Sequence, residues 1–134
     1  MRMVILIALL ILSPTTFALT TDDLKQAKPE LLLQGMHSSC KSNNSSAFLS
    51  LYSSRMVSLV SSRSLNDRKQ FFDTSCSVIV GLVVNKLNGN PASATFYINE
   101  NGKSLCITPS GEPKSCKLQF NVVVENSQLK KDEL

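Results

Sequence analysis

The chain has 134 residues, of which 43% are hydrophobic, with four cysteines and a formal net charge of +4. This length holds one domain with a modest core. The charge is too small to indicate binding to nucleic acid or to an anionic membrane, so we expect neither partner.

Residues 1–18 have the composition of a cleavable secretory signal peptide. Arg2 supplies a short basic start, Met3–Leu12 is an uninterrupted apolar run, and Thr16–Ala18 places small residues before the expected cleavage point. The apolar run is too short to span a bilayer. We therefore expect a signal peptide at 1–18 and a single exported domain at 19–134, in an oxidising compartment.

All four cysteines follow this leader, at Cys40, Cys76, Cys106 and Cys116. An even number of cysteines in a short exported chain predicts two disulfides. Proximity favours Cys106 with Cys116, which leaves Cys40 for Cys76; a rival pairing joins Cys76 to Cys106. None of them has the close Cys-x-x-Cys spacing of structural zinc sites, so we expect no metal.

The first part of the exported domain carries helical patterns. Thr20–Asp23 has the form of a capping box. Pro29 either divides the following segment into two helical pieces or lies in the first turn of one helix, and Gly35 is the expected helix end. The polar segment Lys41–Ser46 then predicts a loop.

A second helical region follows the loop. From Ala47 to Val60 the apolar residues recur every three or four positions, which predicts one helix. Ser64 and Asp67 repeat the capping-box pattern before a further helix. Residues Ser77–Leu87 suit a buried helix or a buried strand, because they are rich in β-branched side chains.

The C-terminal part begins with a clear break at Asn88–Pro91. Ala94–Ile98 and Lys103–Ile107 read as a β-hairpin around the turn Asn99–Gly102. The last segment, Lys117–Lys130, has near-helical apolar spacing, although its three valines also suit a strand. We expect a mainly α domain with one short hairpin, stabilised by disulfides; the alternative is an α+β fold with a helical N-terminal half and an antiparallel β-meander.

Three fragments occur in a characteristic order. Cys40 lies at a polar helix end, Cys76–Gly81 joins a cysteine to an aliphatic pair and a glycine, and Cys106–Pro109 precedes a terminal segment that contains Leu118 and Gln119. This order resembles the Rap- and Tai-type immunity proteins of bacterial type VI secretion systems.

The resemblance implies a mainly helical fold, a periplasmic location and binding to a secreted protein toxin. Members are often dimeric, so it also suggests a homodimer. It favours a helix over Ser77–Leu87, in which Gly81 either allows a neighbouring helix to approach closely or is a tolerated helical glycine. The implied mechanism is occlusion of the toxin's active site, and the expected contacts are the loop residues Asn88, Asn90, Asn99 and Asn101.

We expect no catalytic residues and no cofactor. His37 is the only histidine and lies near Cys40, but a cysteine held in a disulfide is not a nucleophile. The sequence contains no Gly-x-Ser-x-Gly elbow, phosphate loop or dinucleotide fingerprint. A surface histidine at a helix end is the favoured interpretation.

The last four residues match an ER-retrieval tetrapeptide: Lys131, Asp132, Glu133 and Leu134. With the leader, they suggest an alternative function, a secreted effector or an ER-lumenal protein that carries a receptor-read address. In that pathway Asn43 and Asn44, which begin overlapping Asn-x-Ser sequons, would be glycosylated if exposed. In a bacterial protein, which we favour, the four residues are the charged, fraying end of the last helix.

Overall fold

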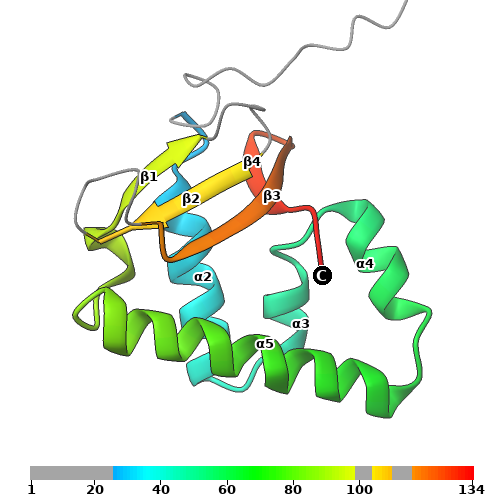
Figure 1. Ribbon diagram of the computed structural model, residues 1–134. Coiled ribbons are helices and arrows are strands. Elements are labelled where there is room, and N and C mark those ends of the chain that lie inside the picture. Colours follow the sequence, from blue (N-terminus) through cyan, green and yellow to red (C-terminus); the bar gives the residue numbers. More distant parts are fainter. Residues whose placement is uncertain (1–25, 99–103, 110–115) are drawn as a thin grey trace, which may run out of the picture.

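The computed structural model describes residues 26–98, 104–109 and 116–134. The expected signal peptide and the pattern Thr20–Asp23 lie outside these residues. Helices come first and strands follow (Figure 1). The helices are α2 (Pro29–Lys41), α3 (Ser45–Leu49), α4 (Ser54–Ser61) and α5 (Leu65–Lys86), followed by the short 3-10 helix η1 (Pro91–Ser93). The strands are β1 (Thr95–Ile98), β2 (Ser104–Thr108), β3 (Leu118–Glu125) and β4 (Gln128–Lys131).

Polar side chains cap the starts of α3, α4 and α5. The side-chain oxygens of Asn44, Ser53 and Ser64 accept hydrogen bonds from backbone N–H groups at the starts of α3, α4 and α5. The cap at Ser64 confirms the start predicted there. The prediction of one helix from Ala47 to Val60 is wrong, because Ser53 begins a new helix after an interruption at residues 50–53.

Of the two helical glycines, Gly35 does not have the role expected of it, whereas Gly81 fits the alternative of a tolerated helical glycine. Pro29 lies in the first turn of α2, but the helix does not end at Gly35 and continues to Lys41. A Cβ on Gly35 would lie 3.1 Å from Cδ2 of Leu51, so this glycine permits a close approach of the chain that follows α3. At Gly81 no atom lies within 4 Å of an added Cβ, so no helix packs closely there.

The segment Ser77–Leu87 is helical, and its apolar residues separate by face. Ile79, Val83 and Leu87 are buried, whereas Val78 and Val84 are more than half exposed. The spacing of the buried residues is that of one helix face. The resemblance therefore favoured the correct alternative for this segment.

The sheet is a four-stranded antiparallel meander in the order β1-β2-β3-β4. The first two strands confirm the predicted hairpin to within one residue, although its Asn-Gly turn lies outside the described residues. The predicted helix over Lys117–Lys130 is wrong, and so is the mainly α class. The α+β alternative, helices followed by an antiparallel meander, is the observed fold.

Strand pairing overrides the helical spacing in this last segment. Phe120 and Val122 are buried while Gln119 and Asn121 are exposed, the alternation of a half-buried strand. Asn126 and Ser127 form the two-residue turn between β3 and β4 with φ of 51° and 61°. Two left-handed residues in a two-residue loop match a type I′ hairpin turn, whose twist suits the flanking strands.

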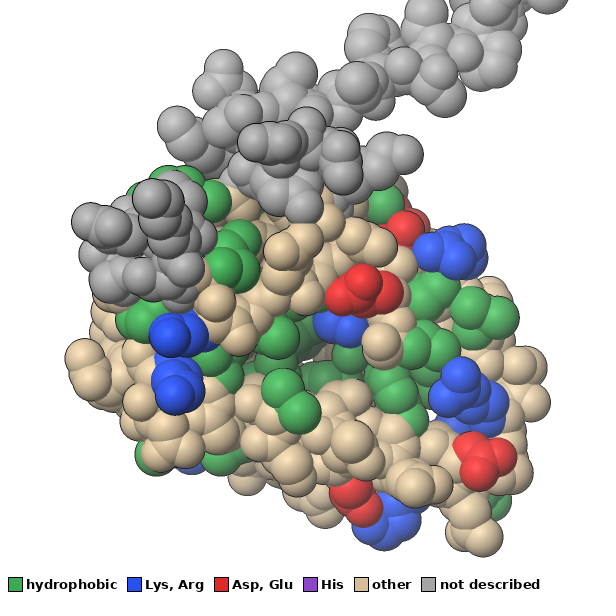
Figure 2. Space-filling view, in the orientation of Figure 1, with side chains coloured by type: hydrophobic (Ala, Val, Ile, Leu, Met, Phe, Trp, Pro, Cys, Tyr) green, Lys and Arg blue, Asp and Glu red, His purple; other side chains and the backbone are tan. Residues whose placement is uncertain are grey.

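The core lies between the sheet and the helices. In Figure 1 α5 runs beneath the sheet, α2 passes behind it, and the chain end labelled C lies between β3 and helices α3 and α4. Figure 2 shows hydrophobic side chains at the centre of this face, between the sheet and α5. The largest fully buried side chains come from both layers and include Leu33, Met36, Phe48, Leu105 and Phe120.

Candidate functional site

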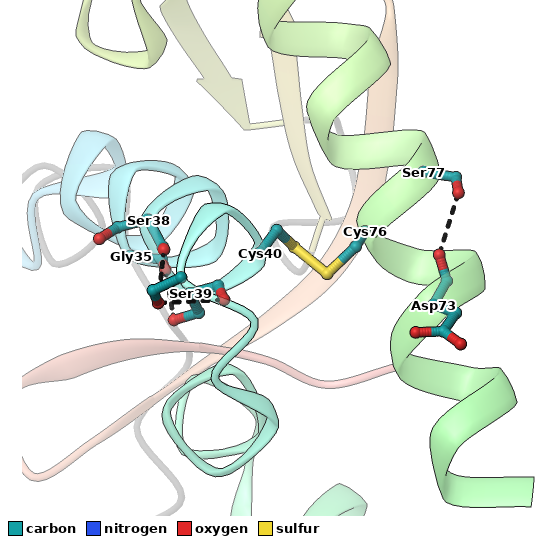
Figure 3. Close-up of a disulfide and its surroundings, with 8 residues drawn as sticks. Gly35, Ser38, Ser39, Cys40, Asp73, Cys76 and Ser77 are labelled. Carbon is teal, nitrogen blue, oxygen red and sulfur yellow. Dashed lines mark hydrogen bonds between the residues drawn. A yellow bond between two sulfur atoms is a disulfide. The ribbon is translucent and has the colours of Figure 1, made fainter. Parts of the chain in front are cut away.

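Both disulfides predicted from sequence proximity are formed. Cys40 at the end of α2 is bonded to Cys76 in the middle of α5, with a Cα–Cα distance of 5.4 Å (Figure 3). Cys106 on β2 is bonded to Cys116, and the rival pairing of Cys76 with Cys106 is absent. Two disulfides in a small domain indicate an oxidising compartment.

The disulfide also decides the role of the cysteine near the only histidine. His37 lies on α2, three residues before Cys40, and is partly exposed. Because the sulfur of Cys40 is bonded to Cys76, it is not a free thiol that His37 could activate.

The first residue of the retrieval-like tetrapeptide is part of the fold. Lys131 forms a parallel β-bridge with Tyr52 in the α3–α4 junction, which we define as residues 50–53. Its N–H donates to the carbonyl oxygen of Leu51 at 3.0 Å, and its carbonyl oxygen accepts from the N–H of Ser53 at 2.8 Å. The sheet and the junction are thus joined through main-chain hydrogen bonds.

The side chain of Lys131 lies over two aromatic rings. Its Nζ is 5.0 Å from the ring centroid of Tyr52 and 5.7 Å from that of Phe120, and it donates to the carbonyl oxygen of Glu133 at 2.7 Å. Burial lowers the pKa of Lys131, and the nearby Glu133 carboxylate opposes this shift. Burial raises the pKa of Tyr52 to about 12.

Asp132 contacts both the sheet and the start of α4, through its main chain and its side chain. Its N–H donates to the carbonyl oxygen of Asn121 at 2.8 Å. Its Oδ1 accepts from Ser53 Oγ at 2.5 Å, and its Oδ2 lies 3.1 Å from Nη2 of Arg55. The serine also caps α4, so one hydroxyl joins a helix start to the tail.

Only the end of the tetrapeptide is open to solvent. Leu134 is 46% exposed and lines a shallow pocket with Phe71 and Ser75 of α5. A receptor that grips all four residues must first displace the contacts of Lys131 and Asp132. Lys131 ends strand β4 and the next three residues follow the strand, so the interpretation of the four residues as the fraying end of a helix is wrong. Receptor reading stays a prediction.

The predicted contact loop at Asn88 and Asn90 is exposed yet held by several hydrogen bonds. Gly89 N–H donates to the carbonyl oxygen of Val83 at 2.8 Å, and Asn90 N–H donates to that of Leu87 at 3.0 Å. Asn90 Oδ1 accepts from the N–H of Ala92 at 2.9 Å. The other predicted contacts, Asn99 and Asn101, lie outside the described residues.

The two sequon asparagines also lie on the surface. Asn43 and Asn44 are both exposed, between α2 and α3. Asn43 has a φ of 52°, and Asn44 Oδ1 accepts from the N–H of Ala47 at 3.0 Å. The side chain of Asn44 therefore already serves as a helix cap.

A pocket that no sequence motif predicts lies between α3 and the first turns of α5. It has a volume of about 380 Å³, with Phe48 and Phe72 among its apolar lining and Ser46 and Arg68 among its polar lining. The Nε atom of Arg68 is buried and has no hydrogen-bond partner among the described residues. The adjacent Arg68-Lys69 and Phe71-Phe72 pairs are the only sequence signal for this site, and they resemble an ordinary amphipathic helix.

In residues 26–98, 104–109 and 116–134, no three His, Cys, Asp or Glu side chains lie close enough together to hold a metal ion. No helix in the same part of the chain is both long and apolar enough to cross a bilayer. No family model, no curated protein and no solved structure matches this chain.

Proposed function

We propose that the protein is a non-enzymatic binding protein of the bacterial periplasm that neutralises a toxic effector by occluding it, as the resemblance to type VI immunity proteins implies. The two disulfides fit an exported protein of an oxidising compartment. They also brace a small domain whose core alone is modest.

The observation that carries this proposal is the loop that follows α5. Asn88 and Asn90 are exposed, while the main chain around them is held by hydrogen bonds to Val83 and Leu87. The hydroxyl of Ser93 adds a hydrogen bond to the carbonyl oxygen of Asn90 at 2.8 Å. A contact loop that is already ordered loses little conformational entropy on binding, which favours tight association.

Neutralisation is tested by co-expressing the protein, with its leader, with the products of the neighbouring genes, each exported to the periplasm, and asking whether one of them is toxic alone. We expect growth to be restored with the wild-type protein. Persistent toxicity when the protein is present in the periplasm would contradict the proposal.

A matched pair of variants tests the loop. Asn88 and Asn126 both lie in exposed turns, with φ of 52° and 51°, so glycine can replace either without backbone strain. We expect Asn88→Gly to weaken effector binding by roughly tenfold, a typical loss for an important interface side chain. Asn126→Gly should leave binding unchanged, and equal affinities for both variants would exclude this loop as the contact.

A further inference from the structure

The long helix α5 has an uncharged outer face. Between Asp73 and Lys86 the helix contains no charged residue, over a stretch of about three turns. On the side away from the core, this stretch carries exposed or half-buried residues: Thr74, Ser77, Val78, Gly81, Val84 and Asn85. We call these residues the outer face of α5. In Figure 3 Ser77 points away from α2, whereas Cys76 points toward α2 and forms the disulfide.

Two valines make the middle of this face apolar. Val78 is 54% exposed and Val84 is 59% exposed, although the solvent side of a helix normally carries polar or charged residues. Gly81 lies midway between them, and no atom lies within 4 Å of a Cβ added there. A partner can therefore approach the main chain of the helix between the two valines. An apolar, uncharged centre is typical of the middle of a protein–protein interface.

The outer face continues into the loop at Asn88. Gly81, Val84 and Asn88 follow one another at spacings of three and four residues, so they lie along one side of the helix and of its extension. The main chain after the helix is fixed, because Gly89 N–H donates to the carbonyl oxygen of Val83 at 2.8 Å. The proposed contact loop and the outer face therefore form one surface, with valines at its middle and an asparagine at its end.

We infer that the outer face of α5 is the apolar part of the effector contact, an inference that rests on the proposed function. The effector presents an uncharged segment, one of whose aliphatic side chains packs between Val78 and Val84 over Gly81. An acidic or basic segment does not fit, because the outer face offers no counter-ion and the charge of the segment would be desolvated without a partner.

A second copy of this chain is the alternative occupant, and the size of the face disfavours it. The stretch from Thr74 to Asn85 is about 17 Å long and about 10 Å wide, from the rise and the diameter of a helix. A stable dimer buries about 800 Å² on each partner. The face alone is too small for such a dimer, whereas the effector is also contacted by the adjoining loop.

Matched substitutions test the inference, with the neighbouring gene product that the wild type neutralises as the probe. Val78→Lys and Val84→Lys place a charge in the apolar middle, and each should weaken binding of this product by roughly 10- to 100-fold. Val84→Ile keeps the face aliphatic and should hold the affinity within about threefold. Leu31→Lys is the control, because Leu31 lies on α2 and is also 54% exposed, and it should leave the affinity unchanged. Wild-type affinity in both valine-to-lysine variants would overturn the inference.

A measurement on the wild-type protein keeps the test decisive if a lysine variant does not fold. In a methyl NMR titration with the same gene product, the signals of Val78 and Val84 should shift or broaden, whereas those of Leu31 should stay unchanged. Unchanged valine signals in a complex that has formed would overturn the inference.

The outcomes separate this inference from the proposed function. Full affinity in Asn88→Gly together with a loss in Val84→Lys would support the outer face and exclude the loop. Neutralisation by the wild type and by both valine-to-lysine variants would overturn the outer face alone, and a wild type that neutralises no neighbouring gene product would overturn both proposals. A wild type that sediments as a dimer, and as a monomer after Val84→Lys, would assign the face to a second copy and overturn the inference.

Discussion

The ammonium group of Lys131 lies 5.0 Å from the centre of the Tyr52 ring, while the main chains of the same two residues form a β-bridge. Burial disfavours the charge, as the lowered pKa shows, whereas the rings attract it and the long side chain covers apolar surface. These effects oppose one another, so the packing of the side chain should matter more than its charge.

We therefore expect Lys131→Met to change the free energy of unfolding by less than about 1 kcal/mol. Lys131→Ala should destabilise by about 1 to 2 kcal/mol, because it uncovers the rings of Tyr52 and Phe120. Urea unfolding at neutral pH measures both. Equal losses with methionine and alanine, both above about 1 kcal/mol, would show that the charge dominates.

Stability should fall at alkaline pH because of Tyr52. Its folded pKa of about 12 is higher than the ordinary value of 10.0, so its contribution is complete below about pH 10 and is lost as the pH rises through about 12. A pKa difference of about two units corresponds to about 2 to 3 kcal/mol in the free energy of unfolding. The titration of Lys131 changes stability in the opposite direction. Because its pKa in the folded protein is below the ordinary value of 10.5, the free energy of unfolding rises as the pH approaches 10.5.

Tyr52→Phe isolates the tyrosine contribution. The variant keeps the ring and removes the titrating hydroxyl, so at neutral pH its free energy of unfolding should stay within about 1 kcal/mol of the wild-type value. Between about pH 9.5 and about pH 11.5, its stability should fall less steeply than that of the wild type. Parallel slopes for the two proteins in urea titrations would contradict this assignment.

The contribution of Asp132 to stability should come more from its hydrogen bond with Ser53 than from its ion pair with Arg55. The arginine side chain is 64% exposed, and exposed ion pairs contribute about 0 to 1 kcal/mol. The hydrogen bond from the Ser53 hydroxyl reaches a carboxylate that is mostly shielded, and such charged bonds contribute about 1.5 to 3 kcal/mol. Thermal unfolding should show a large loss for Asp132→Ala and a small one for Arg55→Ala. Equal losses in the two variants would assign the role to the ion pair, because Asp132→Ala removes that pair as well.

The two helical glycines make a matched pair. At Gly81 an added methyl group meets no atom within 4 Å, so Gly81→Ala should stabilise by about 0.5 to 1 kcal/mol through helix propensity. At Gly35 the methyl group meets Leu51 at 3.1 and 3.2 Å, and Gly35→Ala should gain less or destabilise. Melting temperatures of the two variants test this, and a larger gain at Gly35 would mean that Leu51 moves aside easily.

Leu134 gives the cleanest test of receptor reading. Deleting Lys131–Leu134 would also remove strand pairing, whereas Leu134 is 46% exposed and its replacement by serine should leave stability within about 0.5 kcal/mol. If the tail is structural, the wild type and Leu134→Ser should be secreted equally from a eukaryotic cell. Retention of the wild type alone would support the retrieval function.

The sequence indicated the helices and the disulfides better than the sheet. Local signals identified the cap at Ser64 and the nearby cysteine pair, because both depend on residues close in the chain. The segment after Lys117 was misassigned because Leu118, Val122 and Leu129 match a helical spacing by chance. Only pairing with β2 and β4 shows that Phe120 and Val122 share a buried face.

The site residues divide in the same way. The exposure of Asn88 and Asn90 followed from a turn motif, which is a local property. The pocket at Arg68 could not be foreseen, because it depends on how α3 packs against α5, and α4 lies between these two helices in the sequence. The contacts of Lys131 with the α3–α4 junction were equally hidden, since they join residues about 80 positions apart.

Those contacts bear on the order of events in folding. The bond from Ser53 to Asp132 spans 79 residues, and the bond from Lys130 to Ser50 spans 80. Contacts that close such long loops are slow to form, whereas the helices and the hairpins need only neighbouring residues. We expect the α3–α4 junction to pair with β4 last. A chain emerging from its ribosome or translocon would therefore form its helices early, and the junction would stay unpaired until β4 has been synthesised.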